Sequence, residues 1–309
     1  MKILVTGGAG FIGSHVSEAL CLAGHQVDIL DDLSSGQRAN VPRGARLMVE
    51  DIRSEAAAEL IRKEGYATIV HHAAQMDVRR SVADPGLDAG INLLGLLNLM
   101  EAGRSAGLER VIFASTGGAL YGEPEQGPQP ETHSTRPVSP YGIAKLASEQ
   151  YLYFYQQQYG IRYVALRYGN VYGPRQNPHG EAGVVAIFTQ RLLDGQLVTI
   201  HGDGLQTRDY IYVADVARAN LAALNYEGPS GAFNIGTGRE TDVVNLFERI
   251  RAALGINTRV IYGPAKPGEQ RRSVLNCTKA AEHLRWHPQI GIREGLTLTA
   301  RWFASNWAP

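Results

Sequence analysis

Two residues four positions apart could together carry out acid–base chemistry: Tyr141 and Lys145, in the segment SPYGIAKLASE. Ser139 suits a helix cap and Pro140 suits the first helical turn, so a helix is predicted to begin here. Residues four apart share one helix face, which brings the phenol and the ammonium group together. A free tyrosine has a pKa of about 10, so a tyrosine base working near neutral pH needs about 4 kcal/mol of extra stabilisation of its phenolate. A neighbouring cation can supply it.

The same spacing occurs a second time, at Tyr262 and Lys266. Gly263 and Pro264 lie between them and break any helix, so these side chains cannot share a helical face. The spacing alone is therefore unspecific, and the cap and the helix are what favour the first pair.

A group of hydroxyls lies at the end of an apolar run, in the segment VIFASTGGALYG. The run is predicted to be a buried strand, and Ser115, Thr116, Gly117 and Gly118 follow it directly. Ligands bind at the carboxyl ends of parallel strands in α/β folds, so this stretch is predicted to form the floor of an active site rather than a plain turn.

A glycine-rich loop lies near the N-terminus, in VTGGAGFIGSH. Gly7, Gly10 and Gly13 come directly after a predicted strand and open a predicted helix. Glycines at these positions allow a tight turn, close approach of the backbone to a pyrophosphate, and close packing of helix on strand. The helix N-terminus then faces the phosphate charge. No Gly-Lys-Ser/Thr follows, so the loop is not of the kinase type.

An acidic residue, Asp31, ends the second predicted strand, about 20 residues past the glycines. A carboxylate there can accept both ribose hydroxyls of NAD. It would repel the extra phosphate of NADP by about 4 kcal/mol for unit charges ~4 Å apart at an effective dielectric constant of ~20. NAD is therefore predicted over NADP, although Arg38 could soften the repulsion. Asp51 and Ile52, after the third predicted strand, could bracket the adenine.

Apolar strands alternate with amphipathic helices through the first part of the chain, which predicts a parallel sheet covered on both faces. Strands are predicted at 2–6, 26–30, 45–50, 67–73, 110–115 and 162–173, and helices at 14–24, 55–65, 87–107 and 141–160. After Asn170 the elements become shorter and Gly/Pro-rich loops appear. The predicted fold class is α/β, a Rossmann-type doubly wound parallel sheet in residues 1–168 with a smaller C-terminal α/β domain in 169–309. Residues 209–237 are predicted to return to the first domain.

Composition narrows the partners and the compartment. The 309 residues carry 30 Lys and Arg and 30 Asp and Glu, and no basic stripe appears, which argues against nucleic acid. Cys21 and Cys277 are the two cysteines, so reduced thiols fit better than disulfides. No signal peptide or membrane span is recognisable, and a cytoplasmic protein is predicted. His283 and His287 lack the glutamate of a His-Glu-x-x-His zinc site, so no metal is predicted.

Together these motifs resemble the extended short-chain dehydrogenase/reductase superfamily, in particular its nucleotide-sugar epimerase branch, similar to bacterial UDP-glucose (UDP-galactose) 4-epimerases. Further segments carry the likeness over essentially the whole chain: HHAAQ, Asn92, LRYGNVYGPRQ, GDGLQTRDYIYVADVARA and FNIGTG. The resemblance implies that NAD oxidises C4 of a UDP-hexose and that the 4-keto sugar is then reduced on its other face. Tyr141 would move the proton and Lys145 would hold the nicotinamide ribose and lower the pKa of Tyr141.

The resemblance also assigns residues to each part of the site. The catalytic residues would be Tyr141, Lys145 and Thr116. The cofactor would be bound by Gly7, Gly10, Phe11, Ile12, Gly13, Asp31, Asp32, Leu33, Ser35, Gly36, Asp51, Ile52, Ala73, Ala74, Gln75, Asn92, Ser115, Tyr141, Lys145, Tyr168 and Val171. The substrate would be bound by Met76, Thr116, Tyr141, Asn170, Val184, Val185, Thr199, His201, Arg208, Lys266, Glu269, Arg271 and Ser273.

Three positions depart from the family pattern. The usual catalytic hydroxyl lies four residues before Tyr121, where this chain has Gly117, so either Thr116 or a water must replace it; Thr116 is favoured. Lys266 stands where the family often has an arginine, and Arg271 or Arg272 could compensate. A tyrosine of hexose-restricted relatives aligns with Ser273, and a small residue there resembles members that also accept N-acetylhexosamines.

Other functions stay open. A UDP-glucuronate 4-epimerase would use the same residues. Sugar dehydratases and UDP-glucuronate decarboxylases of this fold carry acidic residues where this chain has Gly117 and Gly118, which argues against both. A regulator that only senses NAD has no need of Tyr141 and Lys145. The aromatic residues of segment 150–160 fit either the core or the helix face through which the family forms homodimers, and a homodimer is expected.

Overall fold

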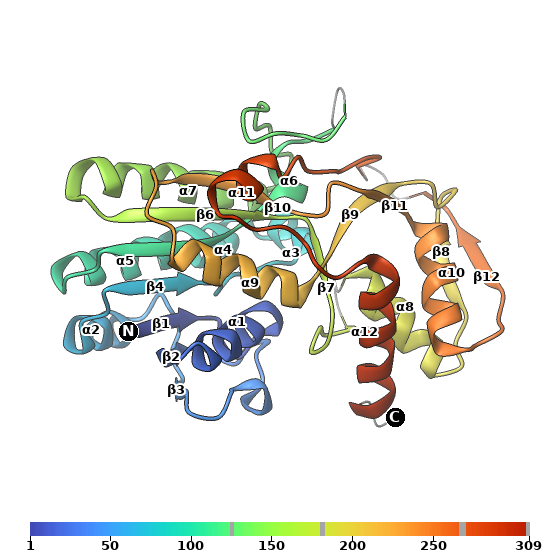
Figure 1. Cartoon of the computed structure of the whole chain (residues 1–309), viewed down its shortest axis with the longest axis horizontal. Helices are drawn as coiled ribbons and strands as arrows, with labels where there is room; N and C mark the ends of the chain where they lie inside the picture. The colour runs from blue at the N-terminus through green and yellow to red at the C-terminus, as the bar shows by residue number, and fades with distance from the viewer. Residues whose placement is uncertain (124–126, 180–182, 266–269, 307–309) are drawn as a thin grey trace.

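The computed structural model describes residues 1–123, 127–179, 183–265 and 270–306. Within these ranges the left-hand part of Figure 1 is a seven-stranded sheet in which all neighbouring strands are parallel. Its strands, in order across the sheet, are β10 (Gly231–Ile235), β6 (Arg162–Tyr168), β5 (Arg110–Thr116), β4 (Thr68–His71), β1 (Lys2–Thr6), β2 (Gln26–Leu30) and β3 (Arg46–Met48). From β3 to β6 this is the order of a Rossmann fold, so the predicted fold class is confirmed.

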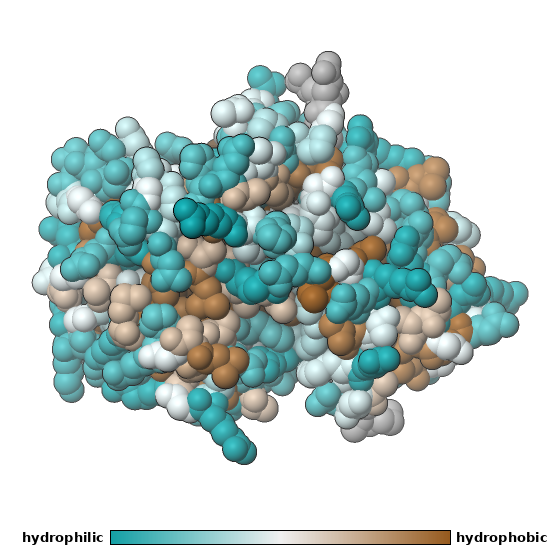
Figure 2. All heavy atoms as spheres, in the orientation of Figure 1, coloured by the Kyte–Doolittle hydropathy of each residue, from teal (hydrophilic) through white to brown (hydrophobic). Residues whose placement is uncertain are grey.

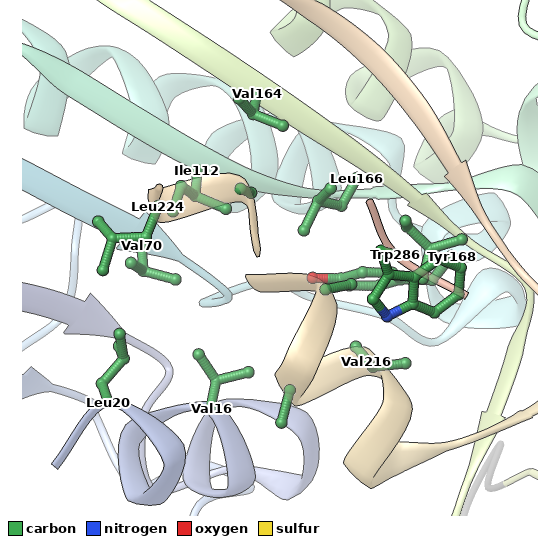
Figure 3. Packing of buried hydrophobic residues seen from close by; sticks show 14 of the residues in the cluster. Val16, Leu20, Val70, Ile112, Val164, Leu166, Tyr168, Val216, Leu224 and Trp286 are labelled. Atoms are coloured by element: carbon green, nitrogen blue, oxygen red, sulfur yellow. The ribbon is translucent and has the colours of Figure 1, made fainter. Parts of the chain in front are cut away.

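Helices cover both faces of the large sheet, because side chains alternate along each apolar strand. Ile3 and Val5 of β1 point into one core and Leu4 points into the other. The first core is closed by α1 (Phe11–Leu22) and α9 (Val213–Leu224), and Figure 3 shows their side chains facing those of the strands. The second core is closed by α2 (Glu55–Glu64), α5 (Gly95–Ser105) and α7 (Pro140–Tyr159).

The right-hand part of Figure 1 consists of small sheets and three helices around a third apolar core. Its strands are β7 (Asn170–Tyr172), β8 (Val198–His201), β9 (Thr207–Tyr212), β11 (Glu240–Asp242) and β12 (Val260–Gly263), and its helices are α8 (Val184–Leu193), α10 (Val243–Leu254) and α12 (Ile292–Asn306). Between β9 and β11 the chain returns to the large sheet as α9 and β10, which is where a return was predicted. The division into domains at residue 168 stays a prediction.

The long helix predicted at 87–107 is interrupted. It consists of α4 (Pro85–Ala89), a π-helical turn η2 (Gly90–Leu94) and then α5. A π-turn inserts an extra residue into a helix and is frequent at functional sites. The other short elements are η1 (Arg38–Asn40), α3 (Val78–Ala83), α6 (Gly117–Leu120) and α11 (Thr278–His283).

The surface is mixed in character. Figure 2 shows hydrophilic residues over most of the visible face, with hydrophobic residues in small groups between them. Among the described helices, none combines the length and the apolar character that a membrane crossing requires.

Candidate active site

The predicted site residues meet at one edge of the large sheet. The glycine loop follows β1, Ala73 to Gln75 follow β4, Thr116 ends β5 and Tyr168 ends β6. Because these strands are parallel, their carboxyl ends lie at the same edge. The strand order reverses direction between β1 and β4, which is the position where such sheets bind ligands.

The glycine loop depends on contacts between backbone atoms. Gly7 has a φ of 68°, and a Cβ there would lie 2.5 Å from the backbone N of Ala73. A Cβ on Gly13 would lie 2.1 Å from the carbonyl O of Gly7, so both positions require glycine. Helix α1 begins at Phe11 with no side-chain cap among the described residues and no acidic residue in its first turn. Its first N–H groups can therefore bind a phosphate group.

Asp31 is fixed to this loop. Its Oδ2 accepts a hydrogen bond from the N–H of Ala9 and its Oδ1 accepts one from the N–H of Leu33, each at 2.9 Å. Gly36 lies against the carboxylate, since a Cβ there would be 2.6 Å from Oδ1. Burial raises the pKa of Asp31, while the backbone hydrogen bonds oppose that rise. Each oxygen has a further lone pair, which suits the ribose hydroxyls.

Other predicted cofactor residues have different local partners. Asp32 accepts a hydrogen bond from the hydroxyl of Ser34 at 2.6 Å. Asp51 forms an ion pair with Arg53 at 2.5 Å, and its hydrogen bonds to that guanidinium lower the pKa of Asp51. Ile52 is buried in the second core. Asp51 and Ile52 were predicted to bracket the adenine, and of these two residues Ile52 places its side chain in the core.

The loop after β4 is locked to η2. The N–H of Gln75 donates to Oδ1 of Asn92, and Nδ2 of Asn92 donates to the carbonyl O of Gln75, both at 2.9 Å. Asn92 is buried in the π-helical turn. Two residues that are 17 positions apart in sequence thus form one wall of the site.

Tyr141 and Lys145 lie on α7, which begins as predicted. The hydroxyl of Ser139 accepts a hydrogen bond from the N–H of Gly142 at 3.2 Å, and Pro140 opens the helix. The ammonium group of Lys145 lies 5.9 Å from the centroid of the Tyr141 ring and donates to the carbonyl O of Ala114 at 2.9 Å. The predicted pair is therefore brought together at the end of β5.

Burial dominates the electrostatics of this pair in the protein without ligands. It lowers the pKa of Lys145 to about 8. It also raises the pKa of Tyr141 to about 12, although the side chain is only half-buried by its exposed area. The predicted lowering of the pKa of Tyr141 relies on Lys145 together with the nicotinamide cation, so it stays a prediction.

The packing at the end of β5 restricts which residue can carry the hydroxyl of the site. A Cβ on Gly117 would lie 2.6 Å from Cδ1 of Leu275, so a side chain at 117 would enter apolar packing. Thr116 caps α6, and its Oγ1 accepts a hydrogen bond from the N–H of Ala119 at 3.2 Å. Asn170 is near, because its Oδ1 would be 3.7 Å from a Cβ on Gly118. This geometry favours Thr116 as the site's hydroxyl.

Ser115 points to the other side of the strand. Its hydroxyl donates to Oε1 of Glu149 at 2.5 Å, and both residues are buried. Glu149 forms an ion pair with Arg167 through two hydrogen bonds of 3.0 and 2.6 Å. Arg167 also donates to the hydroxyl of Tyr121 at 2.7 Å. The side chain of Ser115 therefore belongs to a buried network beneath the site, and its predicted cofactor contact would have to be made by its backbone.

The hydroxyl of Tyr168 is likewise held by neighbouring side chains. Its hydroxyl accepts a hydrogen bond from Nδ2 of Asn220 at 2.9 Å and lies 3.2 Å from Nε2 of His72. Val171 packs against the first core. Asn220 was not predicted from the sequence, and His72 was noted only as part of the segment HHAAQ.

The predicted substrate residues lie on the elements of the smaller part. Val184 and Val185 begin α8, Thr199 and His201 lie on β8, and Arg208 lies on β9. Val185 is buried in the third core, so its side chain serves packing. Met76, on the β4 side, is exposed.

The predicted diphosphate clamp has acidic partners. Both Nη atoms of Arg271 donate to the carboxylate of Asp203, at 2.8 and 2.7 Å. Arg272 pairs with Glu240. Ser273 is buried, and its N–H donates to the carbonyl O of Thr207 at 3.2 Å. Lys266 and Glu269, which are also predicted to bind the substrate, lie outside the described residues.

Comparison with known proteins gives the family. The NAD dependent epimerase/dehydratase family matches residues 3–236. The chain belongs to this family. Along its whole length it is 45% identical to the putative UDP-glucose 4-epimerase of Methanocaldococcus jannaschii, over 98% of this chain and 99% of that relative.

Solved structures agree with this membership. The UDP-glucose 4-epimerase of Thermotoga maritima, solved with UDP-glucose, superposes with a TM-score of 0.96 and is 48% identical, covering 99% of both chains. The Thermus thermophilus UDP-glucose 4-epimerase, solved with NAD, gives a TM-score of 0.94 and is 47% identical, covering 99% of this chain and 100% of that one. The fold prediction and the predicted NAD-dependent epimerase family are therefore confirmed.

Proposed function

We propose that the protein is an NAD-dependent isomerase that interconverts UDP-galactose and UDP-glucose by inverting C4. The observation that carries the proposal is the position of Tyr141 and Lys145 against β5, the strand that ends at Thr116, at the edge of the sheet where the glycine loop also lies. Relatives of this family that match the whole chain are named UDP-glucose 4-epimerases, and one of them was solved with UDP-glucose.

The residues fit NAD. The first turn of α1 offers free N–H groups, and Asp31 offers carboxylate oxygens fixed at the required edge. NAD, when bound, supplies the hydride acceptor for C4 of the sugar and returns the hydride to the opposite face. A negative charge at Asp31 favours NAD over NADP.

The chain's own residues would handle the proton and the sugar. The phenolate oxygen of Tyr141 takes the proton from the 4-hydroxyl, and the phenol formed gives it back when the sugar is reduced again. Thr116 accepts or donates a hydrogen bond at the same hydroxyl, and Asn170 contacts the nucleotide-sugar beside it. Lys145 contributes its positive charge to lowering the pKa of Tyr141 and binds the ribose of the cofactor.

The proposal is tested by mixing the purified protein with UDP-galactose, without added NAD, and following the formation of UDP-glucose. Turnover without added cofactor is expected because the hydride returns to the substrate in each cycle. Bound NAD with no product from either UDP-hexose would overturn the proposal. UDP-glucuronate is then the next substrate to test.

Replacing Thr116 with valine is expected to lower kcat about 100-fold, because it removes a hydroxyl from the proton-transfer step. Valine also removes the cap of α6, so Thr116→Ser is the matched control that keeps both functions and most of the rate. The measurement is kcat with UDP-galactose at saturation. An unchanged rate in Thr116→Val would favour a water in this role.

Ser273 predicts a broader substrate range. Because a small residue at this position resembles members of the family that accept N-acetylhexosamines, UDP-N-acetylglucosamine should be converted at a measurable rate. Ser273→Tyr should reduce that rate more than it reduces the rate with UDP-galactose. The idea is wrong if the wild-type protein leaves UDP-N-acetylglucosamine unchanged while it converts UDP-galactose.

We also propose that the protein is a cytoplasmic homodimer formed through α7. Tyr155 is buried, but Ile143, Tyr151, Tyr153, Phe154 and Tyr159 of the same helix are exposed large hydrophobic residues. Burial of such a stripe between two copies would remove apolar surface from water. Phe154→Glu should halve the mass seen in sedimentation, whereas Leu22→Glu, at an exposed position of α1, should not. A monomeric wild-type protein would contradict the proposal.

A further inference from the structure

Asp88 has a buried carboxylate beside the proposed active site and is not among the residues assigned to that site. Asp88, on α4, is 1% exposed. Its Oδ1 accepts hydrogen bonds from Nε2 of Gln75 and Nδ2 of Asn92, each at 2.9 Å. Its Oδ2 finds no hydrogen-bond partner among the described residues. Burying a carboxylate is costly, and one with a free oxygen calls for a functional explanation.

The hydrogen bonds of Asp88 fix the orientation of two amides. A carboxylate only accepts hydrogen bonds, so the NH₂ groups of both Gln75 and Asn92 must face it. The carbonyl ends then point away: Oδ1 of Asn92 accepts from the N–H of Gln75, and Oε1 of Gln75 accepts from the N–H of Asp77 at 2.6 Å. Asp88 thereby determines the shape of the wall after β4.

The charge of Asp88 also acts across to α7, which packs against α4 and η2. It raises the pKa of Lys145, which burial lowers. It also raises the pKa of Tyr141, in the same direction as burial. On α7, Glu149 raises the pKa of Lys145 as well. The charge of Lys145 in turn helps to lower the pKa of His71, at the end of β4, and of His72, which follows it. The charged residues of α3, Arg79 and Arg80, are exposed to solvent.

We propose that Asp88 is a positioning residue of the epimerase: its Oδ1 holds Gln75 and Asn92 in place, and its negative charge acts on Lys145 and Tyr141 of the helix that packs against α4. The proposal rests on the proposed function and on the roles given there to the residues of α7. On this proposal, α4 and the π-helical turn contribute to the reaction.

Two substitutions separate the two roles. Asp88→Asn keeps an acceptor oxygen and the shape but removes the charge. Asp88→Leu removes both. The matched control is Asp84→Asn, at the exposed cap of the same helix, where asparagine caps as well as aspartate.

The main readout is the pH dependence of kcat with UDP-galactose. Loss of a negative charge lowers the pKa of Lys145 and of Tyr141 together, so both limbs of the profile should move to lower pH by about one unit in Asp88→Asn. Above the alkaline limb this corresponds to a roughly tenfold lower kcat. A merely structural role would lower the rate at every pH without moving either limb.

Two readouts do not depend on turnover. Titration of the phenolate absorbance, taken as the difference from the corresponding Tyr141→Phe protein, should show the same downward shift for Tyr141. Asp88→Leu should lose NAD on gel filtration, whereas Asp88→Asn and Asp84→Asn should retain it. Unshifted limbs and an unshifted phenolate titration in Asp88→Asn would overturn the inference. If wild type and Asp84→Asn are also inactive on UDP-galactose, it is the proposed function that fails, and the phenolate titration still decides the role of Asp88.

Discussion

Replacing Tyr141 with phenylalanine should abolish turnover of UDP-galactose while NAD stays bound. The substitution removes one oxygen and keeps the ring against α7, so the fold has no reason to change. Positioned proton transfer contributes about 10² to 10⁴ in rate, and phenylalanine has no group that can accept or donate the proton. The loss should appear in kcat, measured with UDP-glucose formation as the readout and bound NAD as the internal check.

The chain provides a matched control for this substitution. Tyr262 begins the second Tyr-x-x-x-Lys match but lies on β12, with its side chain exposed. Tyr262→Phe should leave kcat unchanged. A wild-type rate in Tyr141→Phe would remove Tyr141 from the role of base and leave the hydroxyl of Thr116 or a water to replace it.

Because the pKa of Tyr141 is raised in the protein without ligands, its role as a base also depends on the bound cofactor. At about 12, the phenol is a weak acid in the protein without ligands. The positive charge of oxidised nicotinamide, together with Lys145, would favour the phenolate. We therefore expect the phenolate titration of Tyr141 to lie at lower pH in the protein saturated with NAD than in the protein stripped of it.

Replacing Arg167 with methionine should destabilise the protein by about 3–5 kcal/mol, because it leaves Glu149 as a buried carboxylate without its cation. The ion pair is bidentate, and its side chains are 8% and 6% exposed. Ser115 and Tyr121 are hydrogen-bonded to the pair, so the end of β5 should loosen as well. The measurement is the free energy of unfolding from urea denaturation.

Two further proteins make this result interpretable. Arg62→Met removes an exposed pair with Glu55 and should cost under about 1 kcal/mol. Arg167→Met combined with Glu149→Leu removes both charges and should recover much of the loss. If Arg167→Met is no more damaging than Arg62→Met, the buried pair has no such importance.

Much of the fold could be predicted because its signals are local. Each strand of the large sheet is an apolar run, and each covering helix has a repeating apolar face, so the alternation itself indicates a parallel sheet. The interruption at Gly90–Leu94 could not be foreseen, because the π-turn is fixed by tertiary hydrogen bonds such as that from Ser148 to the carbonyl O of Asn92. Helix α12 was not predicted from the sequence.

The site could be predicted where a motif joins residues close in sequence, and less well where distant side chains meet. Tyr141, Lys145 and the glycine loop are of the first kind. Glu149 was missed, although it continues the same four-residue spacing along α7. Asp203, the partner of Arg271, was missed because an ion pair between residues 68 positions apart leaves no trace in a single sequence. The sequence already favours Thr116, and the packing of Leu275 against Gly117, which only the structure shows, adds a physical reason.

The place of β10 in the large sheet has a consequence for engineering. β10 hydrogen-bonds along β6, yet it lies more than sixty residues further along the chain. A fragment cut after Tyr168 would end with β6 as a bare edge, open to pairing with other molecules. Exchanging the smaller part of the chain for that of a relative therefore needs two junctions, one before β7 and another that returns α9 and β10 to the large sheet, rather than one crossover after β6.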